Sequence, residues 1–154
     1  GRFDWQRWIE RARSMGVGEA RIRLARTLEP ATEAEWLERL NDEDPGVRMA
    51  TAKGLWKLRS EAVLRAFLDR LSREEDPEVR VALSINALAA AGEREPPARL
   101  SGRMWRTVWP SLRRAELSDP VEQAAVESLL ASFRWRGRGY SSTALDALER
   151  FWSE

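Results

Sequence analysis

Cysteine and histidine are both absent from the 154 residues of this chain. Without cysteine the chain can form no disulfide, no thiolate metal site and no thiol nucleophile. Without histidine it lacks the commonest general base and the commonest transition-metal ligand, so serine–histidine hydrolysis is excluded within this chain. We therefore expect no enzymatic activity, no metal and no cofactor. The lack of cysteine suits a reducing compartment, and the cytoplasm is the expected location.

Long apolar runs and a strong charge imbalance are also missing. The longest weakly polar run, residues 79–92, is shorter than the roughly 20 residues of a membrane-spanning helix and contains Arg80, Ser84 and Asn86. The 26 basic and 25 acidic residues leave a net charge of +1, so any electrostatic attraction must come from local patches. The chain opens on GRFDW, without an initiator methionine or a signal peptide, as expected of a trimmed or excised domain.

Three Asp-Pro pairs mark helix starts at Asp44, Asp76 and Asp119. An aspartate at the N-cap accepts hydrogen bonds from free backbone N–H groups, and the proline that follows has no N–H to leave unpaired. Apolar residues recur at helical spacing after each pair. The first two pairs lie 32 positions apart and open near copies of one sequence, DPGVRMAT and DPEVRVAL.

Other amphipathic segments alternate with these helices, so the sequence predicts an all-α chain of about nine helices in one domain, residues 1–154. Thr32 with Glu35 forms a capping box, and Ser60 is a second N-cap. Residues 79–91 are apolar nearly all round, as expected of the most enclosed helix. The predicted helix pairs are about 3–28, 32–58, 60–92 and 98–133, and a C-terminal helix follows at 142–153.

Residues 40–58 (LNDEDPGVRMATAKGLWKL) and 71–92 (LSREEDPEVRVALSINALAAAG) resemble HEAT repeats, in which Val-Arg, Ala and Leu follow an Asp-Pro turn. The resemblance implies a right-handed α–α solenoid. It also implies that Arg48 and Arg80 reach toward aspartate side chains of neighbouring turns. The segment after the third Asp-Pro pair, at Asp119, is a poorer copy of the repeat. Glu122 stands there in place of the arginine, and this Asp-Pro pair comes 43 positions after the second one. Irregular stacking is therefore expected near the C-terminal end.

Two basic stretches contain aromatic residues. Residues 98–114 hold five arginines and no acid, and residues 133–142 read FRWRGRGYSS. In the first stretch, Trp105 and Trp109 share helical spacing with apolar residues and are expected in the core, and Pro110 is expected to kink or end the helix. Arginine beside exposed aromatics would suit nucleic acid. The candidate nucleic-acid-binding residues are Arg103, Arg106, Arg134, Arg136 and Arg138.

Acidic residues cluster at 29–44, but their spacing fits a solvated helix face rather than a cation site. The leading functional hypothesis is a non-enzymatic scaffold that binds a protein partner, or another domain of its parent chain, on the concave face of the second helices. The alternative is nucleic-acid binding, because HEAT-like DNA glycosylases resemble this architecture. The candidate protein-binding residues are Lys53, Trp56, Lys57, Trp135 and Tyr140, and the repeat-turn residues are Asp44, Arg48, Asp76, Arg80 and Asp119.

Overall fold

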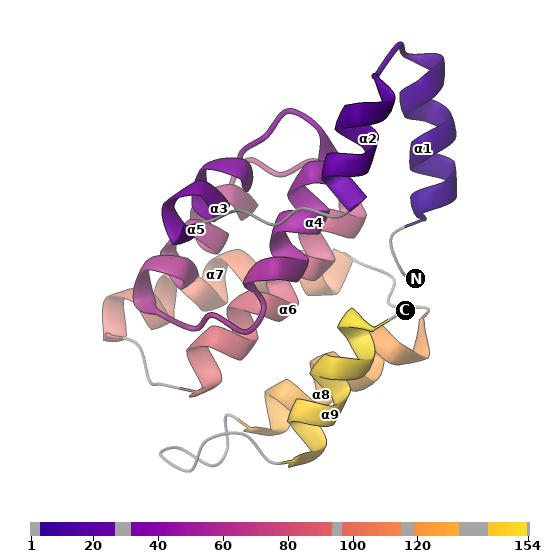
Figure 1. Ribbon diagram of the computed structural model, residues 1–154. Coiled ribbons are helices and arrows are strands. Elements are labelled where there is room, and N and C mark those ends of the chain that lie inside the picture. Colours follow the sequence, from indigo (N-terminus) through magenta and orange to yellow (C-terminus); the bar gives the residue numbers. More distant parts are fainter. Residues whose placement is uncertain (1–3, 27–31, 94–96, 115–118, 133–141, 154) are drawn as a thin grey trace.

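The computed structural model describes residues 4–26, 32–93, 97–114, 119–132 and 142–153, and these residues form nine α-helices and no strand (Figure 1). The all-α repeat architecture predicted from the sequence is thereby confirmed. The helices are α1 (Trp5–Ser14), α2 (Glu19–Arg26), α3 (Glu33–Arg39), α4 (Pro45–Leu55), α5 (Glu61–Leu71), α6 (Pro77–Glu93), α7 (Ala98–Arg114), α8 (Pro120–Ser132) and α9 (Ser142–Trp152).

The Asp-Pro pairs start helices as predicted. α4, α6 and α8 each begin at the proline of a pair. The side chains of Asp44, Asp76 and Asp119 each accept a hydrogen bond from the backbone N–H two positions later, at 2.8–3.0 Å. Thr32 and Ser60 cap α3 and α5 by accepting from the N–H three positions later, at 3.2 Å. These contacts satisfy backbone donors that a helix start leaves free.

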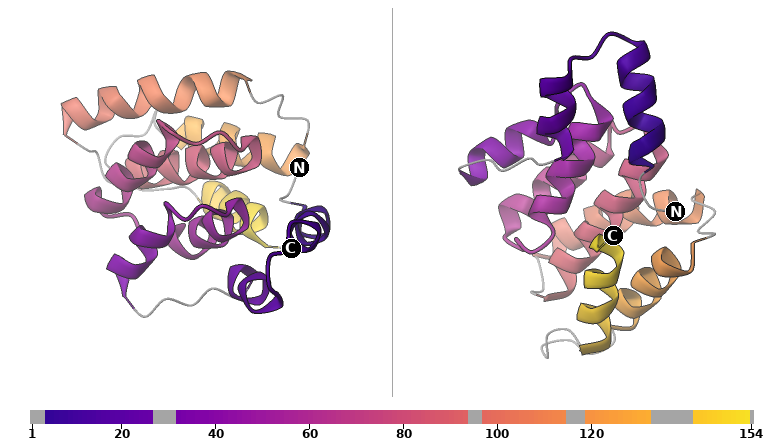
Figure 2. Two further views of the ribbon diagram at one scale, coloured as in Figure 1. Left: turned by 90° about the horizontal axis from the view of Figure 1, so that it is seen from above. Right: turned by 45° about the vertical axis from the view of Figure 1, so that its right-hand side comes forward.

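α6 is the centre of the molecule. It packs against α4, α5, α7 and α8. Seen from above, α7 lies at one edge, and α9 lies on the other side of α6 (Figure 2, left). Val79 and all of residues 81–91 are buried, which confirms that this helix is the most enclosed one. Its apolar residues can therefore face neighbours in every direction.

A smaller apolar cluster joins the N-terminal hairpin to α4. Trp8, Ile9 and Ala12 of α1 pack with Ile22 of α2 and Val47 of α4. The hairpin turns at Gly16, whose φ of 82° suits a residue without a Cβ. The N–H of Val17 donates to the carbonyl of Ala12 at 2.9 Å, which closes the end of α1. α1 is therefore fixed against the start of α4.

Among the described residues, α7 and α8 pack on other helices more than on each other. α7 packs on α5 and α6, and α8 packs on α6 and α9. Of the two outcomes expected for Pro110, a kink or an end of the helix, the second does not occur, because α7 continues to Arg114. Pro110 lies on the exposed side, where water can satisfy the freed carbonyl, and the buried Val108 and Leu112 hold the helix on both sides of it. No helix among the described residues is long and apolar enough to span a membrane.

Candidate interaction surfaces

A buried ion pair ties α4 to the turn between α5 and α6. Arg48 Nε donates to Glu74 Oε2 at 2.7 Å and Arg48 Nη2 donates to Glu74 Oε1 at 2.8 Å, in a two-point pairing. Arg70 Nε adds a third contact to Glu74 Oε2, at 3.0 Å. The expectation that Arg48 reaches an aspartate side chain is thus wrong. The carboxylates of Asp44 and Asp76 cap their own helices, and the longer glutamate takes the arginine instead.

Arg80 makes comparable contacts in the next repeat, again without an aspartate partner. Its Nη1 donates to the carbonyls of Leu71 and Glu74, and its Nη2 donates to Ser111 Oγ of α7 at 2.6 Å. The side chain therefore links α6 to both the preceding turn and α7. The side chains of Arg48 and Arg80 both make hydrogen bonds that join neighbouring repeats, so we assign them a structural role.

Lys53, Trp56 and Lys57, predicted as partner-binding residues, meet at the C-terminal end of α4. Both lysines are exposed and Trp56 is half-buried against the main core. Lys57 Nζ lies 5.2 Å from the centroid of the Trp56 ring, within range of a cation–π interaction. Leu58, which follows, is 40% exposed. We call these four residues the α4 end cluster.

Trp36 of α3 fixes this end of α4. A Cβ built on Gly54 would overlap the ring of Trp36, so the ring of α3 lies directly on the α4 backbone. The same arrangement recurs at the other end, where a Cβ on Gly46 would overlap the ring of Trp8. The signal in the sequence is a pair of glycines inside a predicted helix, where glycine is otherwise unfavourable. α4 is held at both ends.

Trp152 of α9 contacts the middle of α6 at Asn86. Asn86 of α6 is 1% exposed and accepts a hydrogen bond from the indole N–H of Trp152 in α9, at 3.1 Å. Its own amide donates to the carbonyl of Ala52 in α4, at 2.9 Å. Trp152 therefore covers α6 at this point. At the end of α4, by contrast, Lys53, Lys57 and Leu58 are exposed.

α7 presents basic and aromatic side chains on its outer side. Arg99 and Arg106 are exposed, and Arg103 pairs with Asp69 of α5. The core expectation for Trp109 is wrong: its ring is 45% exposed. Trp105 is half-buried and packs against the main core. The two rings differ because α5 and α6 cover only one side of α7.

The nucleic-acid hypothesis required its five arginines to converge on one concave side. Arg103 and Arg106 lie on α7, at the edge of the molecule away from α9 (Figure 2, left). The two described members of the set therefore share one helix. The other candidates from the second basic stretch, Arg134, Trp135, Arg136, Arg138 and Tyr140, lie outside the described residues.

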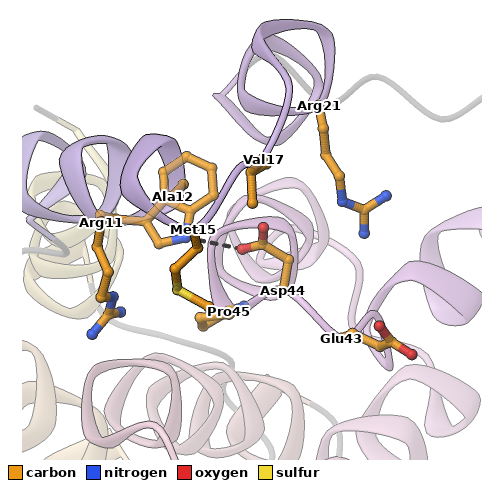
Figure 3. A pocket seen from close by; sticks show the side chains of 9 residues that line it. Arg11, Ala12, Met15, Val17, Arg21, Glu43, Asp44 and Pro45 are labelled. Carbon is orange, nitrogen blue, oxygen red and sulfur yellow. Dashed lines mark hydrogen bonds between the residues drawn. The ribbon is translucent and has the colours of Figure 1, made fainter.

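A pocket of about 620 Å³ opens between the N-terminal hairpin and the start of α4 (Figure 3). Arg11 and Arg21 stand on opposite sides of it, with Asp44 between them. Asp44 Oδ1 accepts the indole N–H of Trp8 at 2.9 Å, and Arg21 pairs with Asp42. Within the lining, Asp44 is thus paired with Trp8, and the lining combines both signs of charge without selecting a ligand.

Acid–base or metal chemistry has no support in the described residues of the chain. No group of three or more acidic side chains there could hold a metal ion. One carboxyl has a clearly lowered pKa: the hydrogen bond from Arg13 lowers the pKa of Glu19. That pair is exposed at the hairpin, with side chains 55% and 60% accessible.

The comparisons with known proteins agree with the repeat pattern. The family model of HEAT repeats matches residues 33–118, which run from α3 to just beyond α7. No curated protein matches the chain, and no solved structure does. The match covers more than half of the 154 residues and includes both predicted copies, so the chain belongs to the HEAT-repeat family.

Proposed function

We propose that this chain is a non-enzymatic scaffold whose α4 end cluster binds a protein partner or a neighbouring domain of its parent chain. HEAT repeats are generally protein-interaction scaffolds. The observation that carries the proposal is the exposed Lys57 beside the half-buried ring of Trp56, together with the exposed Lys53 and Leu58. We further propose that residues 1–154 act as one repeat domain, without a cofactor, in the cytoplasm.

The α4 end cluster combines features typical of residues that dominate binding. Tryptophan is enriched among such residues, and Trp56 is anchored in the core, so little side-chain freedom remains to be lost on binding. The two lysines stand at a helix C-terminus, where the helix dipole stabilises positive charge. A partner that offers a carboxylate beside an apolar side chain would pair with a lysine and cover Leu58.

Photo-cross-linking tests the proposal. The chain would carry p-benzoylphenylalanine in place of Lys57, and separately in place of Arg65 of α5, which is exposed on a different helix. A partner should cross-link at position 57 and not at 65, and mass spectrometry would identify it. The purified partner should then bind the Lys53→Glu/Lys57→Glu variant at least about tenfold more weakly than the wild type, as expected for a charged interface.

The matched control reverses two exposed charges elsewhere, Arg11→Glu on α1 and Arg26→Glu on α2. Binding should change less than about twofold, because these side chains lie on the N-terminal hairpin and salt screens the interaction between distant exposed charges. Undiminished binding by the Lys53→Glu/Lys57→Glu and Trp56→Ala variants would contradict the assigned surface. Substrate turnover by the purified chain would contradict the non-enzymatic role.

A further inference from the structure

Three arginines form one stripe along α7. Arg99, Arg103 and Arg106 are four and three positions apart, so at 100° per residue they lie within an arc of about 60°. Their Cα atoms span about 10.5 Å of helix axis, at 1.5 Å per residue. Residues 98–114 contain no acidic side chain that could neutralise them within the helix. We call Arg99, Arg103, Arg106 and the neighbouring Trp109 the α7 stripe.

The positive charge of the α7 stripe is mostly accessible. Arg99 and Arg106 are exposed, and Arg103 keeps 37% of its side chain accessible while it pairs with Asp69. The guanidinium of Arg106 folds back along the helix, where its Nη1 would lie 3.2 Å from a Cβ on Gly102. Its charge is therefore held close to the helix surface.

Trp109 adds an apolar contact beside these charges. Its ring is 45% exposed, whereas Met104, Val108 and Leu112 of the same helix are buried against the main core. The helix that carries the ring is therefore fixed in place. An exposed tryptophan flanked by arginines on a rigid helix is a composition enriched among residues that dominate protein interfaces.

We propose that the α7 stripe binds an acidic helical segment of a partner protein. Glutamates at positions i, i+3 and i+7 of an antiparallel helix would match the three arginines, whose spacing is i, i+4 and i+7. An apolar residue of the same segment would cover Trp109. The inference rests on the proposed scaffold function and names the class of partner bound at a second surface, on a different helix from the α4 end cluster.

Nucleic acid fits the α7 stripe less well. The three arginines would neutralise at most about three phosphates, which on duplex DNA corresponds to a salt slope of only about −2.7. Proteins that bind single strands combine a basic groove with several stacking platforms, whereas Trp109 is one ring on an outer helix. The net charge of +1 supplies no wider attraction.

Fluorescence anisotropy with a defined probe tests this proposal on the full chain. The probe is a fluorescein-labelled, alanine-based helical peptide with glutamates at i, i+3 and i+7 and one leucine; its control has glutamine in place of glutamate. The glutamate peptide should bind at about 50 mM NaCl and weaken as salt screens the charges. The Arg99→Glu/Arg106→Glu variant should bind it at least about tenfold more weakly, and Trp109→Ala about fivefold more weakly.

Two control variants give the experiment its specificity. Arg11→Glu/Arg26→Glu reverses two exposed charges away from α7 and should change the affinity less than about twofold. Lys53→Glu/Lys57→Glu measures how much of the peptide binding occurs at the α4 end cluster, and it should weaken the binding less than Arg99→Glu/Arg106→Glu does. Circular dichroism would verify that every variant keeps its helices. If the Lys53→Glu/Lys57→Glu variant alone lost the peptide, the α7 assignment would be overturned and the scaffold proposal would survive.

Three further results would overturn the α7 assignment. The first is no binding of the glutamate peptide at about 50 mM NaCl, where screening is weak. The second is equal binding of the glutamate and glutamine peptides. The third is tighter binding of a single-stranded oligonucleotide than of the peptide at about 150 mM NaCl, which would make the stripe a nucleic-acid surface. Each leaves partner binding at the α4 end cluster to be decided by its own cross-linking test.

Discussion

The indole N–H of Trp152 donates to the side-chain oxygen of Asn86 at 3.1 Å, across 66 positions of sequence. Asn86 in turn donates its amide to the carbonyl of Ala52 at 2.9 Å. The side chains of Asn86 and Trp152 are both buried, so water cannot replace these bonds. One amide group therefore joins α4, α6 and α9, and it positions the C-terminal helix over the middle of the second helices.

Removing the indole donor should destabilise the fold. Trp152→Phe keeps an aromatic ring but leaves the Asn86 oxygen without its partner, and we expect a loss of about 1–3 kcal/mol in the free energy of unfolding. Urea denaturation followed by circular dichroism would measure it. Asn86→Ala and the variant with both substitutions complete a double-mutant cycle, which gives the coupling energy between the two side chains. A coupling energy near zero would show that the hydrogen bond contributes nothing measurable to stability.

The buried pair of Arg48 and Glu74 should matter far more than an exposed pair. Glu74→Gln leaves two buried guanidinium groups, those of Arg48 and Arg70, without their carboxylate, and we expect a loss of about 3–5 kcal/mol. Arg65→Ala is the control, because it breaks an exposed i,i+4 pair with Glu61 and should cost at most about 0.5 kcal/mol. Similar losses for the two variants in urea denaturation would contradict this account.

The helix glycines Gly54 and Gly102 should respond oppositely to alanine. Gly54→Ala places a methyl group where the Trp36 ring lies, so the ring must move, at a cost of about 1–3 kcal/mol. Gly102→Ala meets only the flexible end of Arg106 and should stabilise α7 by about 0.5–1 kcal/mol through higher helix propensity. Urea denaturation would compare them, and the indole NMR signal of Trp36 should shift only in the Gly54→Ala variant.

The hairpin carboxyl of Glu19 should titrate below the ordinary range. Arg13 Nε donates to Glu19 Oε1 at 2.6 Å, and this hydrogen bond lowers the pKa of Glu19 below the usual 4.5. Because the folded pKa is depressed, the pair stabilises the fold above the unfolded pKa, and its contribution disappears as the pH falls through the folded value. Carbon-detected NMR would follow the carboxyl. Arg13→Gln should return its pKa toward 4.5, and an unchanged value would refute the cause.

The sequence predicted the helix starts well because capping is a local interaction. Asp44, Asp76 and Asp119 satisfy backbone N–H groups only two positions away, so neighbouring residues decide the outcome. The enclosed position of residues 79–91 was also predictable, since a helix that is apolar all round has no side suited to water. Of the candidate site, the exposure of Lys53 and Lys57 followed from their place opposite the apolar stripe.

The order of helices, their capped starts and the membership of a repeat family were thus determined by the sequence alone, through interactions between residues close in the chain. Only the tertiary structure decided that Glu74 binds Arg48, that Trp109 is exposed, and that α9 covers Asn86. These outcomes depend on which helices pack against each other. The residues involved lie tens of positions apart in the chain, so local sequence patterns do not specify their contacts. Helical periodicity predicts which side of a helix is apolar, but the neighbouring helices decide how much of that side is buried.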